Sequence, residues 1–284
     1  VLLKLYMLTK QWDKAEAEGR ELMKPEYGFE LVPEYKDIFT LANEKNPEII
    51  WACQCAKGYQ EHKWQPHVLP NDYNFTPYLD KMTKWNGYKI SWSFMHTFDP
   101  EDKRLLTIAS EYTSKDGVVH NEKNDSQDPS AQLYLGAVPL KYEFDPDCTG
   151  EDSQIDWIIY RYADVLTLTA EAIVRNKNAV TKEAVDLLNE VRTRSLPGKG
   201  YSLQDLNSVD KFLKAVLNER GWELYFEGNR RQDLIRYGIF VETIKKKAQS
   251  MGKQTLVDEN RHRFPIPQSI IDEGKGVIEQ NPGY

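Results

Sequence analysis

The residues best suited to hold a ligand are aromatic, and many of them lie between positions 51 and 98. This stretch contains eleven aromatic residues, a third of the chain's total. An aromatic ring can cover the apolar C–H face of a sugar, while nearby amides, carboxylates and imidazoles bind the sugar hydroxyl groups. The candidate ligand-binding residues are Trp64, Tyr73, Asn74, Trp85, Tyr88, Trp92 and His96. Together they predict a carbohydrate-binding platform.

The same rings could instead build a core of their own, because irregular segments also bury Trp and Tyr. For any single ring, the sequence leaves both interpretations open. For the stretch as a whole, we expect at least two rings to be exposed on a ligand surface.

Catalysis has little support in the sequence. The chain contains no G-x-S-x-G, H-E-x-x-H, P-loop or G-x-G-x-x-G motif. A glycosidase needs only two carboxylates at a fixed separation, so the 44 acidic residues leave a glycoside hydrolase as an alternative. We expect a binding protein that is not an enzyme and has no cofactor.

We also expect no metal site. The nearest candidate is a calcium loop at residues 145–156, where Asp145, Asp147 and Asp156 fit three ligand positions of an EF-hand. A proline at the second position, an aspartate at the eighth and the lack of flanking helices argue against it.

A second group of chemically notable residues lies at positions 219–236, where acids alternate with arginines. Gly228 predicts a left-handed helix end within this group. Because each acid has an arginine to pair with, we expect a structural ion network rather than catalytic acids, with Arg220 and Glu227 buried at a helix junction. The expected members are Arg161, Asp164, Glu219, Arg220, Glu223, Glu227, Arg230, Asp233 and Arg236.

Helical periodicity marks the elements that would position these groups. Residues 1–24 predict a helical hairpin in which Leu2, Leu5 and Tyr6 face inward and Gly19 allows close packing. Four more helices are predicted. The first covers 163–174, and the second begins after an N-cap at Thr181. The third runs from an N-cap at Ser208 to about 227, and the fourth covers about 229–249.

The middle of the chain, residues 49–155, lacks helical periodicity. It predicts loops with short strands at 132–138 and 107–112. Residues 265–284 are rich in Pro and aliphatic side chains, so we expect them to pack as an extended tail against the helices.

The bulk composition excludes some classes of function. The net charge is −7, and the sequence lacks the clustered basic residues that a nucleic-acid partner would require. No apolar run approaches the length of a membrane span. The three cysteines are most simply small buried hydrophobic residues.

Three motifs give the sequence a family resemblance. Residues 219–236 follow the spacing E-R-x-x-E-L-x-F-E-G-x-R-x-x-D-L-x-R, residues 161–172 read RYADVLTLTAEA, and residues 265–284 run from PIPQ to QNPGY. Looser likeness extends to NPEII at 46–50 and FDPEDKR at 98–104. In this order the motifs resemble the SusD/RagB family of nutrient-binding lipoproteins.

The resemblance implies a mostly α-helical fold of tetratricopeptide-like helix pairs with an aromatic-rich irregular insertion. It also implies that residues 1–284 form one such domain without its N-terminal part. Its expected parts are a helical hairpin and connection at 1–48, the insertion at 49–155, and helical pairs with a C-terminal tail at 156–284.

In function, the resemblance implies a lipoprotein on the cell-surface face of the outer membrane of a Bacteroidetes-type bacterium. Such a protein would capture oligosaccharide and pass it to a SusC-like TonB-dependent transporter. The lipid anchor itself is absent from this sequence. Uptake of peptides in the manner of RagB, and a lid for the transporter with no ligand of its own, are the alternatives.

Overall fold

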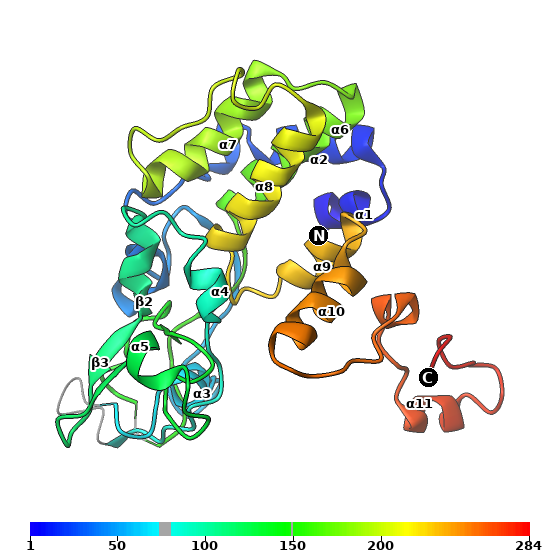
Figure 1. Cartoon of the computed structure of the whole chain (residues 1–284). Helices are drawn as coiled ribbons and strands as arrows, with labels where there is room; N and C mark the ends of the chain where they lie inside the picture. Colours follow the sequence, from blue (N-terminus) through cyan, green and yellow to red (C-terminus); the bar gives the residue numbers. More distant parts are fainter. Residues whose placement is uncertain (74–80, 149) are drawn as a thin grey trace.

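The computed structural model describes residues 1–73, 81–148 and 150–284, and within them helices dominate. The scaffold consists of α1 (Leu2–Leu8), α2 (Trp12–Leu22), α6 (Tyr162–Lys177), α7 (Lys182–Ser195) and α8 (Val209–Glu223). Helix α6 lies at the centre and contacts α2, α7 and α8 (Figure 1). Its residues are buried without interruption from Tyr162 to Val174, as expected for a helix covered on all sides.

The N-terminal hairpin forms as predicted, but with a different buried face. Leu3 and Met7 are buried. Leu2 and Leu5 are each about half exposed, so the prediction that these two face inward was wrong. A helix of seven residues is too short for its periodicity to identify the inner face. Gly19 does allow close packing, because a Cβ there would lie 2.1 Å from Thr169 Oγ1 on α6.

Side-chain caps mark the starts of α7 and α8. The Thr181 hydroxyl accepts a hydrogen bond from the Ala184 N–H at 3.2 Å, and the Ser208 hydroxyl accepts one from the Lys211 N–H at 3.3 Å. Both predicted caps are therefore confirmed.

The helix ends differ more from prediction. Helix α8 stops at Glu223 rather than near 227, and the predicted helix 229–249 is divided into α9 (Arg230–Arg236) and α10 (Phe240–Ser250). Gly238 follows α9 and its C-cap Tyr237, and its φ angle of +72° is the left-handed conformation typical of a helix end. Gly228 also has a positive φ angle, +76°, but it lies beyond Leu224, the C-cap of α8, so the prediction that Gly228 ends this helix was wrong.

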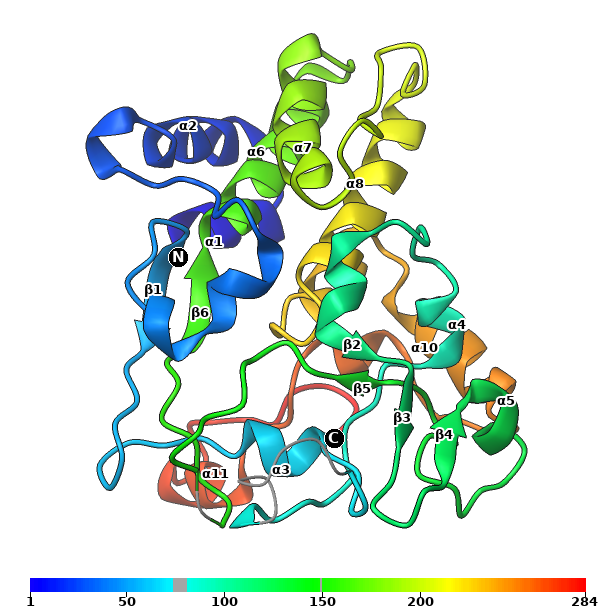
Figure 2. The same cartoon turned by 90° about the vertical axis from the view of Figure 1, so that its left-hand side faces the viewer.

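The insertion leaves and rejoins the helices through one small sheet (Figure 2). Strand β1 (Ile49–Cys53) pairs antiparallel with β6 (Trp157–Arg161), so the two ends of the insertion meet at its base. Two further antiparallel pairs lie within it. They are β2 (Ile108–Ala109) with β5 (Val138–Pro139), and β3 (Glu111–Thr113) with β4 (Val119–Asn121).

The strand predictions for the insertion were only partly right. The stretch 107–112 contributes to β2 and β3, but most of 132–138 forms turns and only its last residue enters β5. The insertion also carries the short helices α3 (Trp64–Val68), α4 (Trp92–Met95) and α5 (Glu122–Asp125). Its aromatic and aliphatic side chains build a core distinct from those between the helices.

The C-terminal segment does not pack as predicted. It contains the short helix α11 (Gln268–Glu273), and Phe264 and Val277 are 70% and 87% exposed. Figure 1 shows this segment extending away from the helical scaffold. Its link to the scaffold includes Arg231, which donates to the Arg261 carbonyl at 2.6 Å and lies 4.2 Å from the Phe264 ring centroid. None of the described helices is both long enough and apolar enough to cross a membrane.

Candidate functional site

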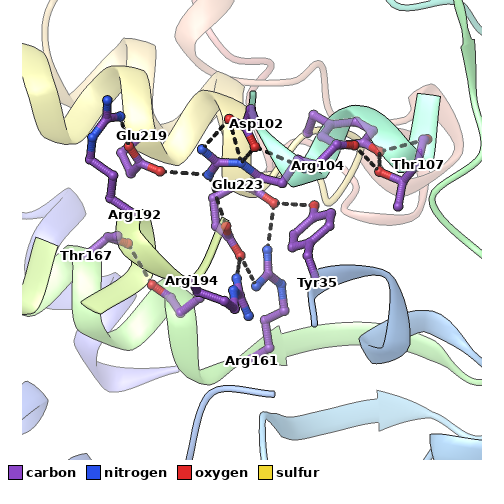
Figure 3. A network of polar contacts seen from close by, with 12 residues as sticks. Tyr35, Asp102, Arg104, Thr107, Arg161, Thr167, Arg192, Arg194, Glu219 and Glu223 are labelled. Carbon is purple, nitrogen blue, oxygen red and sulfur yellow. Dashed lines mark hydrogen bonds and ion pairs between the residues drawn. The ribbon is translucent and has the colours of Figure 1, made fainter. Parts of the chain in front are cut away.

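Residues 219–236, which we call the signature corner, contribute charged side chains to a buried ion network (Figure 3). Glu223 stands at its centre and accepts hydrogen bonds from Arg104 at 3.1 Å, Arg161 at 2.5 Å and Arg194. Glu219 bridges Arg104, at 2.7 Å, to Arg192, at 3.0 Å. Helix α8 therefore presents two acids to arginines from the insertion, from β6 and from α7.

A second part of the network lies between α6, α8 and α9. Arg220 binds Asp164 at 2.7 Å and Asp233 at 2.9 Å, and its side chain is 1% exposed. Arg236 binds Glu171 at 2.8 Å and also Asp233 at 2.9 Å. The expected cross-links between packed helices are thus present.

Glu227 joins the first part of the network and Arg230 stands apart from it. The Glu227 carboxylate binds Arg161 Nε at 2.7 Å and the Lys141 ammonium, and its side chain is 5% exposed. Arg230 was expected to pair with an acid, but it donates to the Leu217 carbonyl at 2.6 Å. Arg230 therefore contacts the backbone of α8 and not an acidic side chain.

These acids are held in their charged form. Burial alone would raise the pKa of Glu223, but the guanidinium groups of Arg194, Arg161 and Arg104 lower it well below its usual range. The pKa of Glu227 is lowered against burial in the same way by Arg161 and Lys141. A buried, fully paired carboxylate cannot approach a substrate, so this network is a structural element and we assign it no catalytic role.

Sequence reasoning missed several members of the network. Glu48 binds Arg161 at 2.7 Å, and Asp102 binds Arg104 at 2.7 Å. Both fall within stretches whose family likeness was visible, NPEII and FDPEDKR, so a signal existed. Arg194 had no such signal, because its partners lie far away in the sequence.

Two exposed aromatic rings of the insertion lie against one histidine ring. Trp85 and Tyr88 are 38% and 47% exposed. Between them lies His67, whose ring centroid is 4.7 Å from that of Trp85 in an edge-on contact and 4.9 Å from that of Tyr88 in a stacked one. We refer to His67, Trp85 and Tyr88 as the aromatic platform.

Backbone hydrogen bonds fix the platform to the end of α3. The Trp85 N–H donates to the Pro66 carbonyl at 2.8 Å, and the Tyr88 N–H donates to the His67 carbonyl at 2.7 Å. Asn86 takes a left-handed conformation with φ of +53°, which Asn tolerates better than most residues. Next to it, a Cβ on Gly87 would lie only 3.0 Å from the His67 carbonyl oxygen, so the turn needs a small residue.

The other predicted ligand residues do not join this platform. Trp64 and Tyr73 are buried, with 5% and 0% exposure, and a ring without an accessible face cannot stack on a sugar. We therefore drop both from the candidate contact set. Asn74 lies outside the described residues.

Trp92 is the first residue of α4 and His96 directly follows this helix, which lies away from α3 (Figures 1 and 2). The Trp92 ring packs against the core of the insertion, and its Nε1 donates to the Leu133 carbonyl at 3.1 Å. His96 is exposed, and its Nε2 lies 2.8 Å from a Glu122 carboxylate oxygen. The structure therefore brings Trp85 and Tyr88 together on the platform, whereas Trp92 and His96 lie elsewhere on the insertion.

The calcium candidate is not assembled as a cluster. Asp145 is buried and accepts the backbone N–H groups of Asp147 and Gln154, each at 2.9 Å. Asp156 accepts the Cys55 N–H at 2.7 Å. Among the described residues, which exclude position 149 of this loop, no three His, Cys, Asp or Glu side chains are grouped so as to hold a metal ion.

Comparison with known proteins finds a matching family model and several related proteins. The SusD family model matches residues 145–284, the part that carries most of the ion network. SusD-like protein P2 of Formosa agariphila is 27% identical over 209 residues, which cover 70% of this chain and 41% of the relative. The starch-binding protein SusD of Bacteroides thetaiotaomicron is 30% identical over 132 residues, 44% of this chain and 21% of that protein.

A solved structure extends the likeness to the whole fold. Surface glycan-binding protein A from Bacteroides thetaiotaomicron, in complex with laminarihexaose, superposes with a TM-score of 0.72 at 19% identity, over 98% of this chain and 62% of that one. The chain therefore spans less than two thirds of the length of these relatives. The family model and these relatives lead to one conclusion: residues 145–284, with the ion network that they carry, belong to the SusD family.

Proposed function

We propose that this chain captures oligosaccharide on the aromatic platform. One observation carries the proposal: Trp85 and Tyr88 are exposed, and both rest on the same histidine ring. A sugar ring laid on either aromatic face buries its C–H surface there, and its hydroxyl groups stay free to bind water or polar side chains.

The platform is held in place before ligand arrives. Its turn is hydrogen-bonded to α3, and the Tyr88 ring rests on Phe226, with centroids 6.1 Å apart. Phe226 follows α8 and so connects the platform to the corner that contains the ion network. Rings fixed in this way lose little conformational freedom on binding, which favours affinity.

The known relatives support a carbohydrate as the ligand. One is named as starch-binding, and another was solved with laminarihexaose. We further propose that the whole protein is a lipoprotein on the cell-surface face of the outer membrane. There it would hand the captured oligosaccharide to a SusC-like TonB-dependent transporter without breaking a bond.

Calorimetric titration tests the platform. Starch and laminarin oligosaccharides, and a peptide mixture for the alternative of peptide uptake, are titrated against the parent and against the Trp85→Ala and Tyr88→Ala variants. We expect glycan binding that each substitution weakens by about 1–3 kcal/mol, by analogy with stacked bases. Because stacking joins neutral groups, the affinity should change little between low and high salt.

The matched control is Tyr27→Ala, since Tyr27 is 46% exposed but lies beside the helical hairpin. It should bind glycan like the parent. Platform variants that bind like the parent would contradict the proposed site. Binding of peptide without glycan would favour the peptide alternative, and release of reducing sugar during the titration would favour a hydrolase.

A further inference from the structure

A groove of about 710 Å³ lies beside β1, at the base of the insertion. Its volume is within the range of small-molecule binding sites. It shares no residue with the aromatic platform. The groove is lined by Glu44, Lys45, Ile49, Ile50, Trp51, Ala52, Gln54, Cys55, Ala56 and Asp156.

The groove offers an exposed aromatic ring. Trp51 is 54% exposed, although it belongs to a strand. It is paired across the sheet with Tyr160, and the two ring centroids lie 5.7 Å apart. The Lys4 ammonium lies 5.0 Å from the Tyr160 centroid on the helical side. The indole is therefore held by its strand partner while much of its surface stays open to solvent.

Two carboxylates stand at the same groove. A Glu44 oxygen accepts the Asp156 N–H at 2.8 Å, and an Asp156 oxygen accepts the Cys55 N–H at 2.7 Å. Each bond uses one oxygen, and within the described residues the second oxygen of each carboxylate has no partner in the chain. Partial burial and the neighbouring Asp156 raise the pKa of Glu44, although the backbone hydrogen bond opposes this. The groove thus combines an open indole with hydrogen-bond acceptors that lack donors.

We propose that this groove is a second carbohydrate contact site, specific for uncharged sugar residues. The inference deepens the proposed function and depends on it for the class of ligand. Trp51 covers the C–H face of a sugar, and the free oxygens of Glu44 and Asp156 accept its hydroxyl groups. Uronate or sulfate groups would be repelled by these carboxylates, which Lys45 offsets only in part.

Fluorine NMR of the full chain labelled with 5-fluorotryptophan reads the two sites separately. The Trp51 and Trp85 signals are assigned by their loss in Trp51→Phe and Trp85→Phe. Neutral starch and laminarin oligosaccharides should shift the Trp51 signal in a saturable way, and should still do so in the Trp85→Ala, Tyr88→Ala double variant. Trp12, on α2 and outside both sites, provides a signal that should not move.

The carboxylates are tested by Glu44→Gln combined with Asp156→Asn, which keeps an acceptor for each backbone N–H. We expect neutral glycan to shift Trp51 at about tenfold higher concentration, because the variant lacks the two carboxylate oxygens that accept the sugar hydroxyl groups. A sulfated oligosaccharide should leave the Trp51 signal of the parent unmoved and shift it in this variant.

The outcomes separate the two proposals. If neutral glycans shift Trp85 but not Trp51, the groove proposal is overturned and the platform stands. If they shift Trp51 but not Trp85, the groove is a carbohydrate site and the platform proposal fails. A parent in which neither signal moves overturns both, and a Trp51 shift equally strong with sulfated glycan overturns the proposed specificity.

Discussion

Phe226 lies edge-on against the indole of Trp64, with ring centroids 5.3 Å apart and planes at 71°. On another side its ring meets Tyr88 of the aromatic platform, at 6.1 Å. Phe226 also has a φ angle of +58°, a left-handed conformation that L-residues with a side chain seldom adopt. One strained residue therefore connects the signature corner, the core of the insertion and the candidate ligand surface.

This geometry predicts that, at position 226, a glycine variant is more stable than an alanine variant, the reverse of the usual order. Phe226→Ala removes the ring and keeps the strain, and we expect it to lower the free energy of unfolding by about 2–4 kcal/mol. Phe226→Gly removes the ring and also relieves the left-handed conformation, so it should be about 1 kcal/mol more stable than the Ala variant. Urea denaturation of both variants measures the difference.

Leu224, whose φ angle is −107°, is the control position. There the usual order should hold, with Gly less stable than Ala because of its greater backbone freedom. If Gly is less stable than Ala at both positions, the conformation at 226 carries no strain. We also expect both Phe226 variants to bind glycan more weakly, since Tyr88 loses its support.

Arg220→Ala tests the ion network. The change leaves Asp164 and Asp233 buried without their main partner, and we expect it to lower the free energy of unfolding by about 3–5 kcal/mol. Lys182→Ala breaks an exposed pair with Asp186 and should cost less than about 1 kcal/mol. Urea denaturation compares them, and similar losses would show that the buried network contributes little. Glycan affinity of the folded Arg220 variant should equal that of the parent.

The same network predicts acid sensitivity. The pKa of Glu223 and Asp164 is lowered in the fold, because their arginine partners outweigh the effect of burial. A lowered folded-state pKa contributes stability that is present above the unfolded value and is lost as the pH falls through the folded one. Stability should therefore decline below about pH 4.5, where unfolded glutamates begin to bind protons.

Thermal unfolding between pH 7 and pH 3 measures this decline. The difference between parent and Arg220→Ala should narrow as the pH falls below about 4, because protonated Asp164 no longer needs its partner. A difference that stays constant over this range would contradict the assignment of the lost stability to charge pairing.

Local features of the fold were predictable from sequence, and long-range ones were not. Thr181 and Ser208 act on backbone groups three residues away, so the sequence alone identified both caps. The inner face of α1 depends on how α2 and α6 pack against it. The pattern of apolar residues in a seven-residue helix cannot predict this packing. The partners of Arg194 lie 146 and 29 residues away, at Glu48 and Glu223.

The candidate site shows the same limit. The sequence identified the stretch that holds Trp85 and Tyr88, because its aromatic content is high. It could not separate them from Trp64, which is buried, since an irregular segment has no periodicity to tell inner from outer positions. The exposure of Trp51 was hidden for a related reason, because the pairing of β1 with β6 shifts register on both sides of Trp51 and so interrupts the regular alternation of the strand.

Lys89, next to the platform, provides a test at alkaline pH. Burial lowers the pKa of Lys89 to about 8 from its usual 10.5, and its ammonium donates to the Val68 carbonyl at 3.2 Å. Because the folded-state pKa is the lower one, its contribution to stability is complete above about pH 10.5 and is lost as the pH falls through about 8. The parent should therefore gain stability relative to Lys89→Met as the pH rises from 8 to 10.5.

Chemical denaturation at a series of pH values measures this gain as the difference between the two proteins. Only the difference between the two proteins isolates Lys89. Burial also lowers the pKa of Lys141 to about 8, so Lys141 makes the stability of the parent and of Lys89→Met rise with pH in the same way. Lys182→Met, at a lysine whose side chain is 76% exposed, should show no such change with pH. If the gap between parent and Lys89→Met stays constant from pH 7 to 10.5, the lysine beside the platform is solvated, and the turn that carries Tyr88 is looser than its hydrogen bonds indicate.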